Sequence, residues 1–478
     1  MITYDKLFIG GWTTPASNER IDVISASSEE PIGSVPAATE ADVDAAVAAA
    51  RRAFDDPQGW ANWEPARRAD ALDQLADKLE AKGEEMARRV SAQNGMPITI
   101  SSQLEAGFPL ILLRYYANLL RGFEFEVEQD HLMGGKTYVR REPVGVVGAI
   151  APWNYPQALA AFKHAPALAA GCAIVLKPSP ETVLDAFLFA EAVAETDIPE
   201  GVVNIVPGGR EIGAYLVAHP DIDKVAFTGS TAAGRQIATT CGQMLRPVTL
   251  ELGGKSAAIV LDDANLDLSV MGERLFESLL VNNGQTCYLG TRILAPDNRY
   301  DEVVDTLAAF MSSLPVGDAL DASTMIGPMA SRTHRDRVEG FIDKGKGDGA
   351  RVVVGGGRSD RDRGWFVEPT LFADVDNKST IAQEEIFGPV LSVIRYSDVD
   401  NAIAIANDSD YGLGGSVWTS DPDRGRDVAR RVRTGTIGIN RYLPDPGAPF
   451  GGVKDSGIGR ELGPQSLDSY LVYKSIYA

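Results

Sequence analysis

Short apolar runs rich in β-branched residues alternate with stretches of helical spacing from Val144 onward. Strands that are apolar on both faces need helices on both sides, which is typical of a parallel, doubly wound sheet. The runs form two successive sets, namely VGVVGAIA, AIVLK, NIV, KVAFT and VTLEL, followed by SAAIVL, TRILA, ARVVV, PVLSVI and GTIGIN. We therefore predict an α/β fold with two doubly wound lobes.

Local signals suggest where these lobes begin and end. The Gly253-Gly254 pair lies between the two sets of runs and is the candidate boundary. Helices are predicted over residues 39–55, where the first and fourth residues have capping-box spacing, and from Pro65 to Asn94. Residues 137–143 and the C-terminal LDSYLVYKSIYA alternate polar and apolar side chains. We expect these two segments to form a small projecting sheet that pairs between subunits.

Charge and cysteine content limit the partners and the compartment. The 478 residues include 45 Lys and Arg against 66 Asp and Glu, a net charge of −21. Such a surface repels phosphates, so we expect no nucleic-acid and no membrane partner. No apolar run reaches the roughly 18 residues of a spanning helix, and the first residues lack a secretory-signal pattern. Cys172, Cys241 and Cys287 lie far apart, which predicts reduced thiols and a cytoplasmic protein.

Three short strings contain residue types suited to covalent catalysis. Cys287 ends the string NNGQTC, whose Asn-Gly turn can present the sulfur to a cleft. A buried structural cysteine is the competing interpretation, and we keep it for Cys172 and Cys241. Glu251 ends an apolar strand in VTLELGGK and is either a solvated strand tip or, beside a thiol nucleophile, a general base. Asn154 in APWNYP is either a turn residue or an amide donor to an oxyanion.

The string FTGSTAAGRQ, residues 227–236, predicts a strand that leads into a helix whose first N–H groups can bind a phosphate. Its spacing resembles a P-loop, but Arg235-Gln236 stands where Lys and Ser or Thr are required, so an ATPase is disfavoured. The chain also lacks GxGxxG, HExxH and GxSxG strings. We therefore expect no metal site and neither a zinc nor a serine hydrolase.

Seven strings follow one another along the chain, namely APWNYP, KPSPET, FTGST, ELGGK, GQTC, EEIFGP and PFGGVKDSGIGRE. In this order and with these gaps, the chain resembles the aldehyde dehydrogenase superfamily over nearly its whole length. The resemblance implies a homodimer or homotetramer of three-part subunits. The parts are a Rossmann-like NAD(P)-binding domain (1–123 and 143–253), a catalytic domain (254–445) and bridging, oligomerising segments (124–142 and 446–478).

The resemblance also implies a reaction, in which an aldehyde is oxidised to a carboxylic acid with NAD(P)+ through a cysteine thiohemiacetal and thioester. It assigns the nucleophile to Cys287, the general base to Glu251 and the oxyanion donor to Asn154. NAD is the expected cofactor and NADP stays open, because Pro180 replaces a glutamate common in the family and Glu181 follows it. Cofactor binding is assigned to Trp153, Lys177, Gly229, Ser230, Gly234, Glu385 and Phe387.

The same resemblance predicts a mainly aromatic and aliphatic channel for the small-molecule aldehyde. Its expected lining is Tyr155, Phe162, Thr286, Tyr288, Leu443 and Phe450. Such walls favour hydrophobic or aromatic aldehydes, whereas Arg441 or Asp445 inside the channel would select a charged one. Three alternatives stay open, namely a thioester-forming acylating dehydrogenase, a hydrolytic esterase that works through Cys287, and a non-catalytic binding or scaffold protein on this fold.

Overall fold

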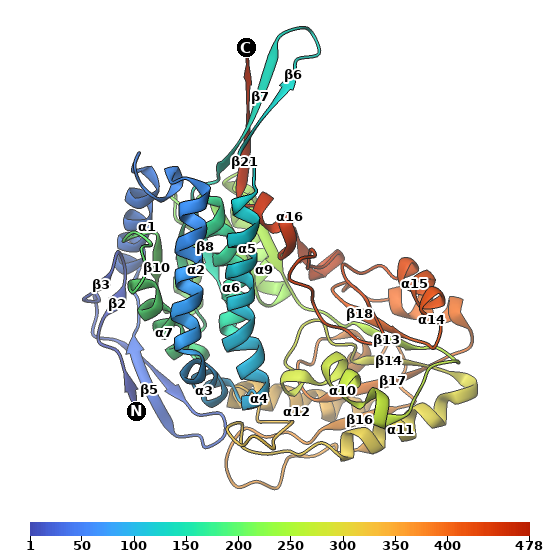
Figure 1. Cartoon of the computed structure of the whole chain (residues 1–478). Helices are drawn as coiled ribbons and strands as arrows, with labels where there is room; N and C mark the ends of the chain where they lie inside the picture. Colours follow the sequence, from blue (N-terminus) through green and yellow to red (C-terminus); the bar gives the residue numbers. More distant parts are fainter.

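The computed structural model describes all residues from 1 to 478, and its first large sheet has the order β20-β12-β11-β8-β9-β10-β2-β3 (Figure 1). The five central strands are parallel and coincide with the first set of predicted runs. They are β8 (Val146–Ile150), β9 (Ala173–Lys177), β10 (Val203–Ile205), β11 (Lys224–Thr228) and β12 (Val248–Glu251). Short antiparallel edge strands, which the apolar runs do not predict, are β2 (Leu7–Phe8), β3 (Trp12–Thr13) and β20 (Gly457–Ile458).

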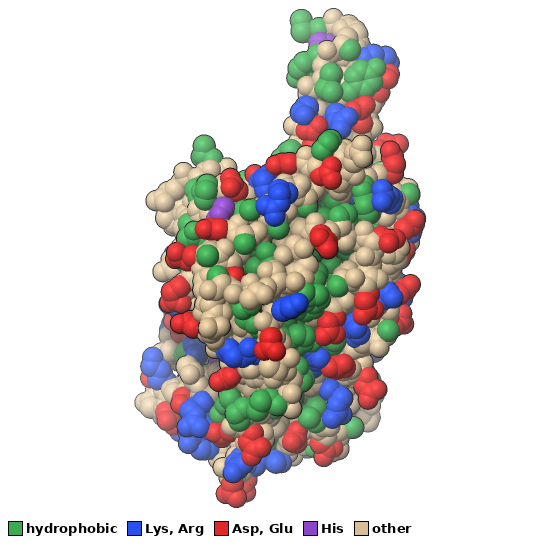
Figure 2. Space-filling model, turned by 90° about the vertical axis from the view of Figure 1, so that its left-hand side faces the viewer, with side chains coloured by type: hydrophobic (Ala, Val, Ile, Leu, Met, Phe, Trp, Pro, Cys, Tyr) green, Lys and Arg blue, Asp and Glu red, His purple; other side chains and the backbone are tan.

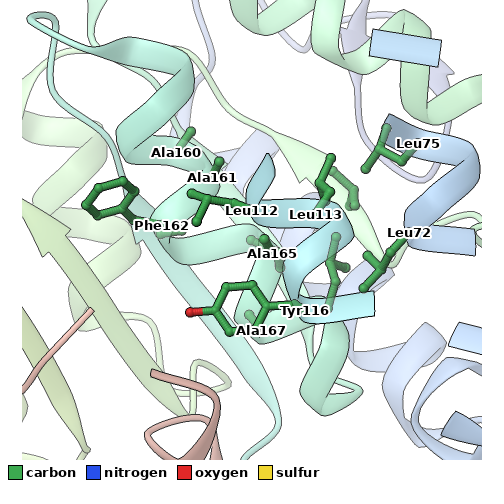
Figure 3. Close-up of a cluster of buried hydrophobic side chains, with 14 of the residues drawn as sticks. Leu72, Leu75, Leu112, Leu113, Tyr116, Ala160, Ala161, Phe162, Ala165 and Ala167 are labelled. Carbon is green, nitrogen blue, oxygen red and sulfur yellow. The ribbon is translucent and has the colours of Figure 1, made fainter. Parts of the chain in front are cut away.

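Helices cover both faces of this sheet because successive strand residues point to opposite sides. Val147 and Ala149 of β8 belong to one hydrophobic core, together with α2 (Pro65–Ala81), α5 (Phe108–Arg121) and α6 (Pro156–Ala170). Figure 3 shows this core, with leucines of α2 and α5 close to the alanines of α6. Val146 and Ile150 of β8 belong to the opposite core, with α1 (Glu40–Asp55), α8 (Arg210–Ala218) and α9 (Thr231–Gln243), while α7 (Leu184–Ala194) contributes side chains to both cores.

The second sheet has the order β15-β16-β17-β14-β13-β18-β19 and is parallel except for β15 at its edge. Its strands are β13 (Ala257–Val260), β14 (Arg292–Pro296), β15 (Arg351–Val354), β16 (Thr370–Ala373), β17 (Val390–Tyr396), β18 (Gly415–Trp418) and β19 (Gly438–Ile439). One face packs on α10 (Leu268–Leu279) and α11 (Tyr300–Ser312), the other on α12 (Arg332–Gly347), α13 (Thr380–Gln383), α14 (Val399–Asn407) and α15 (Pro422–Arg431). The α/β fold with two doubly wound lobes is therefore confirmed.

A third sheet projects from the body of the molecule and contains the C-terminus (Figure 1). It consists of β6 (Glu126–Asp130), β7 (Lys136–Pro143) and β21 (Leu471–Tyr477). The predicted pairing of residues 137–143 with the C-terminal segment is confirmed, because Thr137 lies opposite Tyr477 and Pro143 opposite Leu471. Residues 446–470 lie outside this sheet, where β20 extends the first sheet and α16 (Gly463–Asp468) contributes Leu467 to the core beside α6.

The predicted start of the first helix is confirmed, but the predicted length of the second helix is not. Thr39 caps α1 and forms the predicted capping box with Asp42. The single helix predicted from Pro65 to Asn94 is wrong, because the chain breaks at Lys82 into α2 and α3 (Gly83–Asn94). Glycine after Lys82 is a poor helix former, so the break costs little.

Other differences involve very short strands. The run GTIGIN forms only the two-residue strand β19. A small N-terminal sheet, which no run indicates, has the order β1-β5-β4 and comprises β1 (Ile2–Thr3), β4 (Arg20–Ile24) and β5 (Pro31–Pro36). No helix combines the length and the apolar content that crossing a membrane would demand.

Candidate active site

Cys287 follows a tight left-handed turn, as the Asn-Gly signal predicts. Asn282, Asn283 and Gly284 have φ values of 54°, 60° and 75°. A Cβ atom on Gly284 would lie 2.1 Å from the carbonyl oxygen of Gly388, so only glycine fits this close approach. The turn therefore brings the segment before Cys287 tightly against the chain that leads into β17.

Buried amide side chains hold this segment in place. Asn283 Nδ2 donates to the carbonyl oxygens of Gly95, at 2.8 Å, and Pro328, at 3.0 Å. Gln285 Oε1 accepts from the backbone N–H of Ala330 at 2.9 Å. Because Gly95 comes from the first lobe and Pro328 from the second, the loop is anchored to both. Such anchoring preorganises a reactive side chain.

Asn154 lies at the carboxyl end of the central strand β8 and is bound to the same loop. Its Nδ2 donates to the carbonyl oxygen of Gln285 at 3.0 Å, and its own carbonyl oxygen accepts from Asn94 and Asn282 at 3.1 and 2.9 Å. An amide nitrogen carries two hydrogens, so this bond leaves one for another acceptor. Asn154 and Cys287 line the same cavity.

Glu251 ends β12 inside the protein, with only 1% of its surface exposed. Neither carboxyl oxygen has a hydrogen-bond partner. Burial and the nearby Glu461 raise the pKa of Glu251 well above its usual value. Burial and the charge of Glu251 in turn raise the pKa of the Cys287 thiol, so the thiol is protonated at neutral pH. A carboxylate with a raised pKa beside a thiol suits proton transfer between them.

A buried ion pair that sequence reasoning missed lies near Glu251, and its two charges act on the pKa of Glu251. Lys163 of α6 donates to Glu461 Oε1 at 2.9 Å and to Thr228 Oγ1 at 2.6 Å, and both charged side chains are buried. The available signal was Lys163 itself, a charge in the otherwise apolar stretch of α6, because lysine is rarely buried without a partner. Its partner lies 298 residues away, beyond any local pattern.

One cavity beside Cys287 has a volume of about 370 Å³ and mostly apolar walls. Tyr155 and Thr286 in its wall are hydrogen-bonded to each other, with their hydroxyl oxygens 2.8 Å apart. Tyr288 stacks on Tyr442 with ring centroids 4.6 Å apart. All six residues predicted for the aldehyde channel line this cavity, together with Gln103, Leu104, Phe108, Ile111, Ala158, Leu159, Glu277, Cys287, Arg441, Pro444 and Pro446. Their contact with a substrate stays a prediction.

A second cavity of about 200 Å³ meets the first at Cys287, and many of its lining residues have polar or charged side chains, so we call it the polar cavity. It contains Asn154, Glu251 and five of the predicted cofactor residues, which are Trp153, Gly229, Ser230, Glu385 and Phe387. The other two lie outside its lining. Lys177 is buried and donates to the carbonyl oxygens of Pro178 and Gly208, both at 2.9 Å. Gly234 is buried in the first turn of α9.

Features of this polar cavity fit a dinucleotide. Ser230 caps the 13-residue helix α9, so the free N–H groups of its first turn face the strand end where a phosphate would be held. A Cβ on Gly234 would lie 2.5 Å from a side-chain carbon of Leu252, which explains the glycine. Glu385 accepts from the N–H of Gly254 at 2.9 Å, and burial raises its pKa to about 7.

His334 and Arg337 of α12 also line the polar cavity, and sequence reasoning missed both. His334 donates from Nε2 to the carbonyl oxygen of Phe387 at 2.6 Å, and burial lowers the pKa of His334 to about 4. Its ring lies 4.9 Å from that of Trp153, which is 5.4 Å from that of Phe387. A neutral aromatic wall therefore closes this side of the cavity.

Comparisons with known proteins agree with this geometry. The model of the aldehyde dehydrogenase family matches residues 12–476. The geranial dehydrogenase of Castellaniella defragrans is 58% identical over 477 residues, which cover 100% of this chain and 99% of that relative. The Mycobacterium tuberculosis aldehyde dehydrogenase in complex with NAD+ superposes with a TM-score of 0.97 at 49% identity, covering 100% of this chain and 98% of that one.

Aldehyde dehydrogenase C of Pseudomonas syringae, solved with NAD+ and octanal, superposes with a TM-score of 0.94 at 39% identity, covering 99% of this chain and 96% of that one. The family match, the full-length relatives and the two lobes agree with one another. The chain therefore belongs to the aldehyde dehydrogenase family and is an enzyme of that family.

Proposed function

We propose that this enzyme oxidises apolar aldehydes to carboxylic acids with NAD+, through a thiohemiacetal and a thioester on Cys287. The observation that supports this most strongly is the position of Cys287, the one residue that lines both the apolar and the polar cavity. A thiol at that junction can meet an aldehyde from one side while a redox cofactor occupies the other.

The first step joins the Cys287 sulfur to the aldehyde carbon. The thiol proton leaves to solvent, and the carbonyl oxygen becomes an oxyanion that the free amide N–H of Asn154 and the N–H of Cys287 stabilise. Bound NAD(P)+ supplies the acceptor for the hydride that the resulting thiohemiacetal loses. In the last step Glu251 removes a proton from water, which attacks the thioester and releases the acid and the free thiol.

The residues proposed to hold the cofactor are those of the polar cavity with Lys177 and the first turn of α9. We propose NAD over NADP, because Glu181 supplies a negative charge that would repel a 2′-phosphate and Ser179 donates to its carboxylate. The M. tuberculosis and P. syringae relatives are bound to NAD+. Comparison of kcat/KM for the two cofactors checks this, and a preference of about tenfold or more for NADP would contradict it.

The proposed substrates are hydrophobic or aromatic aldehydes of medium length. The apolar cavity favours them because each Å² of apolar surface removed from water contributes about 25 cal/mol. The relative at 58% identity is named for geranial, a branched apolar aldehyde. A KM series from acetaldehyde to octanal and benzaldehyde tests this, and equal KM values along the series would contradict it.

We also propose that the projecting sheet pairs with a second subunit in a homodimer or homotetramer. Leu132 and Met133 at its tip are almost fully exposed, and the hydrophobic residues of β21 after Leu471 are between 43% and 72% exposed. Figure 2 shows hydrophobic side chains on the surface of this projection. Deletion of residues 472–478 removes this strand but keeps the buried Leu467 and Tyr470. The truncated protein is expected to have a lower mass in light scattering, whereas the full-length oligomer's mass would contradict the proposal.

The thiol chemistry requires Cys287 to stay reduced, which favours the cytoplasm as the compartment.

Activity is tested directly by mixing the protein, NAD+ and octanal and following the absorbance of NADH. Octanoic acid is the expected product. An acyl-coenzyme A product, formed only when coenzyme A is added, would indicate the acylating alternative. No NADH with any aldehyde would favour a non-catalytic protein.

A further inference from the structure

Two charged side chains line the otherwise apolar cavity, and they are bound to each other. Arg441 donates from Nε to Glu277 Oε2 and from Nη2 to Glu277 Oε1, both at 2.6 Å. Arg441 is the only cation among the residues that line this cavity. In this two-pronged geometry, the edge of the guanidinium that best matches a carboxylate is already occupied.

Neighbouring contacts hold this pair at one place in the wall. Glu277 lies in the last turn of α10, and Arg441 lies in the loop that follows β19. The backbone N–H of Tyr442 donates to Ser278 Oγ at 2.9 Å, so the next residue along each segment is also bound. The loop therefore carries Arg441 to Glu277 with a second hydrogen bond beside the pair, and the guanidinium is oriented along the wall.

Two further carboxylates lie near this pair, and the exposed Arg274, three residues before Glu277 on α10, is not among the residues that line the cavity. Glu273 lies one turn earlier on α10 and contributes to the electrostatic field at Arg441. Asp445 lies in the same loop as Arg441 and is exposed. With Glu277 bound, the single positive charge of the wall is neutralised, and these two carboxylates remain. An approaching anion therefore meets no free cation in the cavity lining.

We propose that Glu277 sets the charge specificity of the channel by occupying Arg441, so that the channel accepts uncharged aldehydes and rejects aldehydes that carry a distal carboxylate. This inference rests on the proposed function, because it treats the apolar cavity as the aldehyde channel. It adds a latent anion site. Removal of the Glu277 charge frees Arg441 to bind the carboxylate of an oxo acid by the same two hydrogen bonds.

The test compares substrates of equal length that differ only in their far end, namely hexanal with 6-oxohexanoate and nonanal with 9-oxononanoate. The measured quantity is the ratio of kcat/KM for the oxo acid to kcat/KM for the aldehyde. Glu277→Gln is expected to raise this ratio about tenfold for at least one pair, a factor set by a charge-assisted hydrogen bond to a partly exposed group. Salt at about 0.5 M should reduce the gain, because it screens exposed charges.

Matched variants separate charge from loop anchoring. Glu273→Gln makes the same charge change one turn away and should alter the ratio by less than about twofold, since surface charges contribute little. Arg441→Gln, and the double variant with Glu277→Gln, should lack the gain because no guanidinium remains. An equal loss on both substrates in Glu277→Gln, or the same gain in the double variant, would overturn the inference.

Wild-type enzyme distinguishes this inference from the proposed function. If it oxidises nonanal and 9-oxononanoate with equal kcat/KM, the charge specificity is absent and the inference fails alone. If it oxidises no aldehyde with NAD+ or NADP+, the proposed function fails first. Normal oxidation of nonanal with an unchanged ratio in Glu277→Gln also defeats only the role of Glu277.

Discussion

The two cavities that meet at Cys287 differ in their walls and in how those walls are held. The apolar cavity is built from rings and aliphatic side chains of α5, α6 and the loop 441–450. The charges of Glu277 and Arg441 in its wall neutralise each other. The polar cavity contains Glu251, Glu385 and Asn154 at or near the ends of strands and turns. In the proposed function, substrate binding by apolar side chains and catalysis by charged groups therefore take place in two separate cavities. Cys287 is the residue that the two cavities share.

This separation shows why a buried carboxylate is tolerated without a hydrogen bond. Glu251 has no partner for either oxygen, which costs stability in the folded protein. Groups that are left unsatisfied in this way are common where chemistry is done, since their pKa is shifted toward the working pH. No comparable group lies in the apolar wall, where the hydroxyls of Tyr155 and Thr286 satisfy each other.

The shared thiol gives the largest expected effect. Cys287→Ala should reduce kcat for octanal by at least about 10³-fold, since several kcal/mol of barrier lowering depend on the covalent intermediate. Cofactor binding, measured by fluorescence titration with NADH, should survive. Cys241→Ala is the control, because that thiol lines neither cavity. Retention of more than about a tenth of wild-type kcat in Cys287→Ala would reject the covalent mechanism.

On the polar side, Glu251→Gln should slow the steady rate by about 10²- to 10⁴-fold, the usual range for a general base. Stopped-flow absorbance should still show a burst of NADH, because the thiol proton can leave to solvent during acylation. The burst would separate hydrolysis, which needs the carboxylate, from thioester formation. A parallel loss of burst and steady rate would contradict the assignment of Glu251 to hydrolysis.

Asn154→Ala should slow the burst itself by about 10²-fold, the effect of losing one oxyanion donor. Alanine also removes the hydrogen bond from Nδ2 to the Gln285 carbonyl, but Asn94 and Asn282 still bind the main-chain carbonyl of residue 154, and Asn283 and Gln285 still anchor the loop. The loop should therefore stay in place. A burst within about threefold of wild type would show that the backbone N–H of Cys287 is sufficient.

In the apolar wall, a side-chain truncation should change binding more than chemistry. Tyr288→Ala is expected to raise KM for octanal about tenfold, which corresponds to roughly 50 Å² of lost apolar contact. KM for acetaldehyde should change less, because it offers little surface. An equal rise for both aldehydes would show that Tyr288 supports the site as a whole instead of contacting the chain of the substrate.

The smallest expected effect is the pH dependence of the steady rate, which depends on Glu251 in the polar cavity. Hydrolysis needs deprotonated Glu251, and burial raises its pKa, so the protonated and inactive form persists to higher pH than for an ordinary glutamate. The steady rate should therefore rise with pH, by at most about tenfold per unit below that pKa. In Glu251→Gln this step should vanish. A steady rate that is already constant with pH above 4.5, the usual value for a glutamate, would contradict the assignment of the base.

Sequence reasoning reached the strands and the site strings because both are local patterns. The apolar runs predicted β8, β9, β11 and β12, and the Asn-Gly signal predicted the turn before Cys287. Partners far apart in the chain were out of reach. Lys163 and Glu461 are 298 residues apart, and Glu277 and Arg441 are 164 apart, so neither pair has a spacing that a pattern could reveal.

Short elements were missed for another reason. Strands of two residues, such as β2, β3 and β20, carry too few side chains to show alternation, and their position at a sheet edge depends on neighbours that are already folded. The junction of two cavities at one cysteine is likewise a property of packed lobes. It became visible only when both walls were in place.

Intact-mass spectrometry of the Glu251→Gln enzyme tests the role of Cys287 most directly. The protein is incubated with NAD+ and octanal and then quenched in acid. Our account predicts a mass increase of one octanoyl group, located on the peptide that contains Cys287 and absent from the Cys287→Ala/Glu251→Gln double variant. NADH formation without any adduct on Cys287, or an adduct that persists in the double variant, would contradict it.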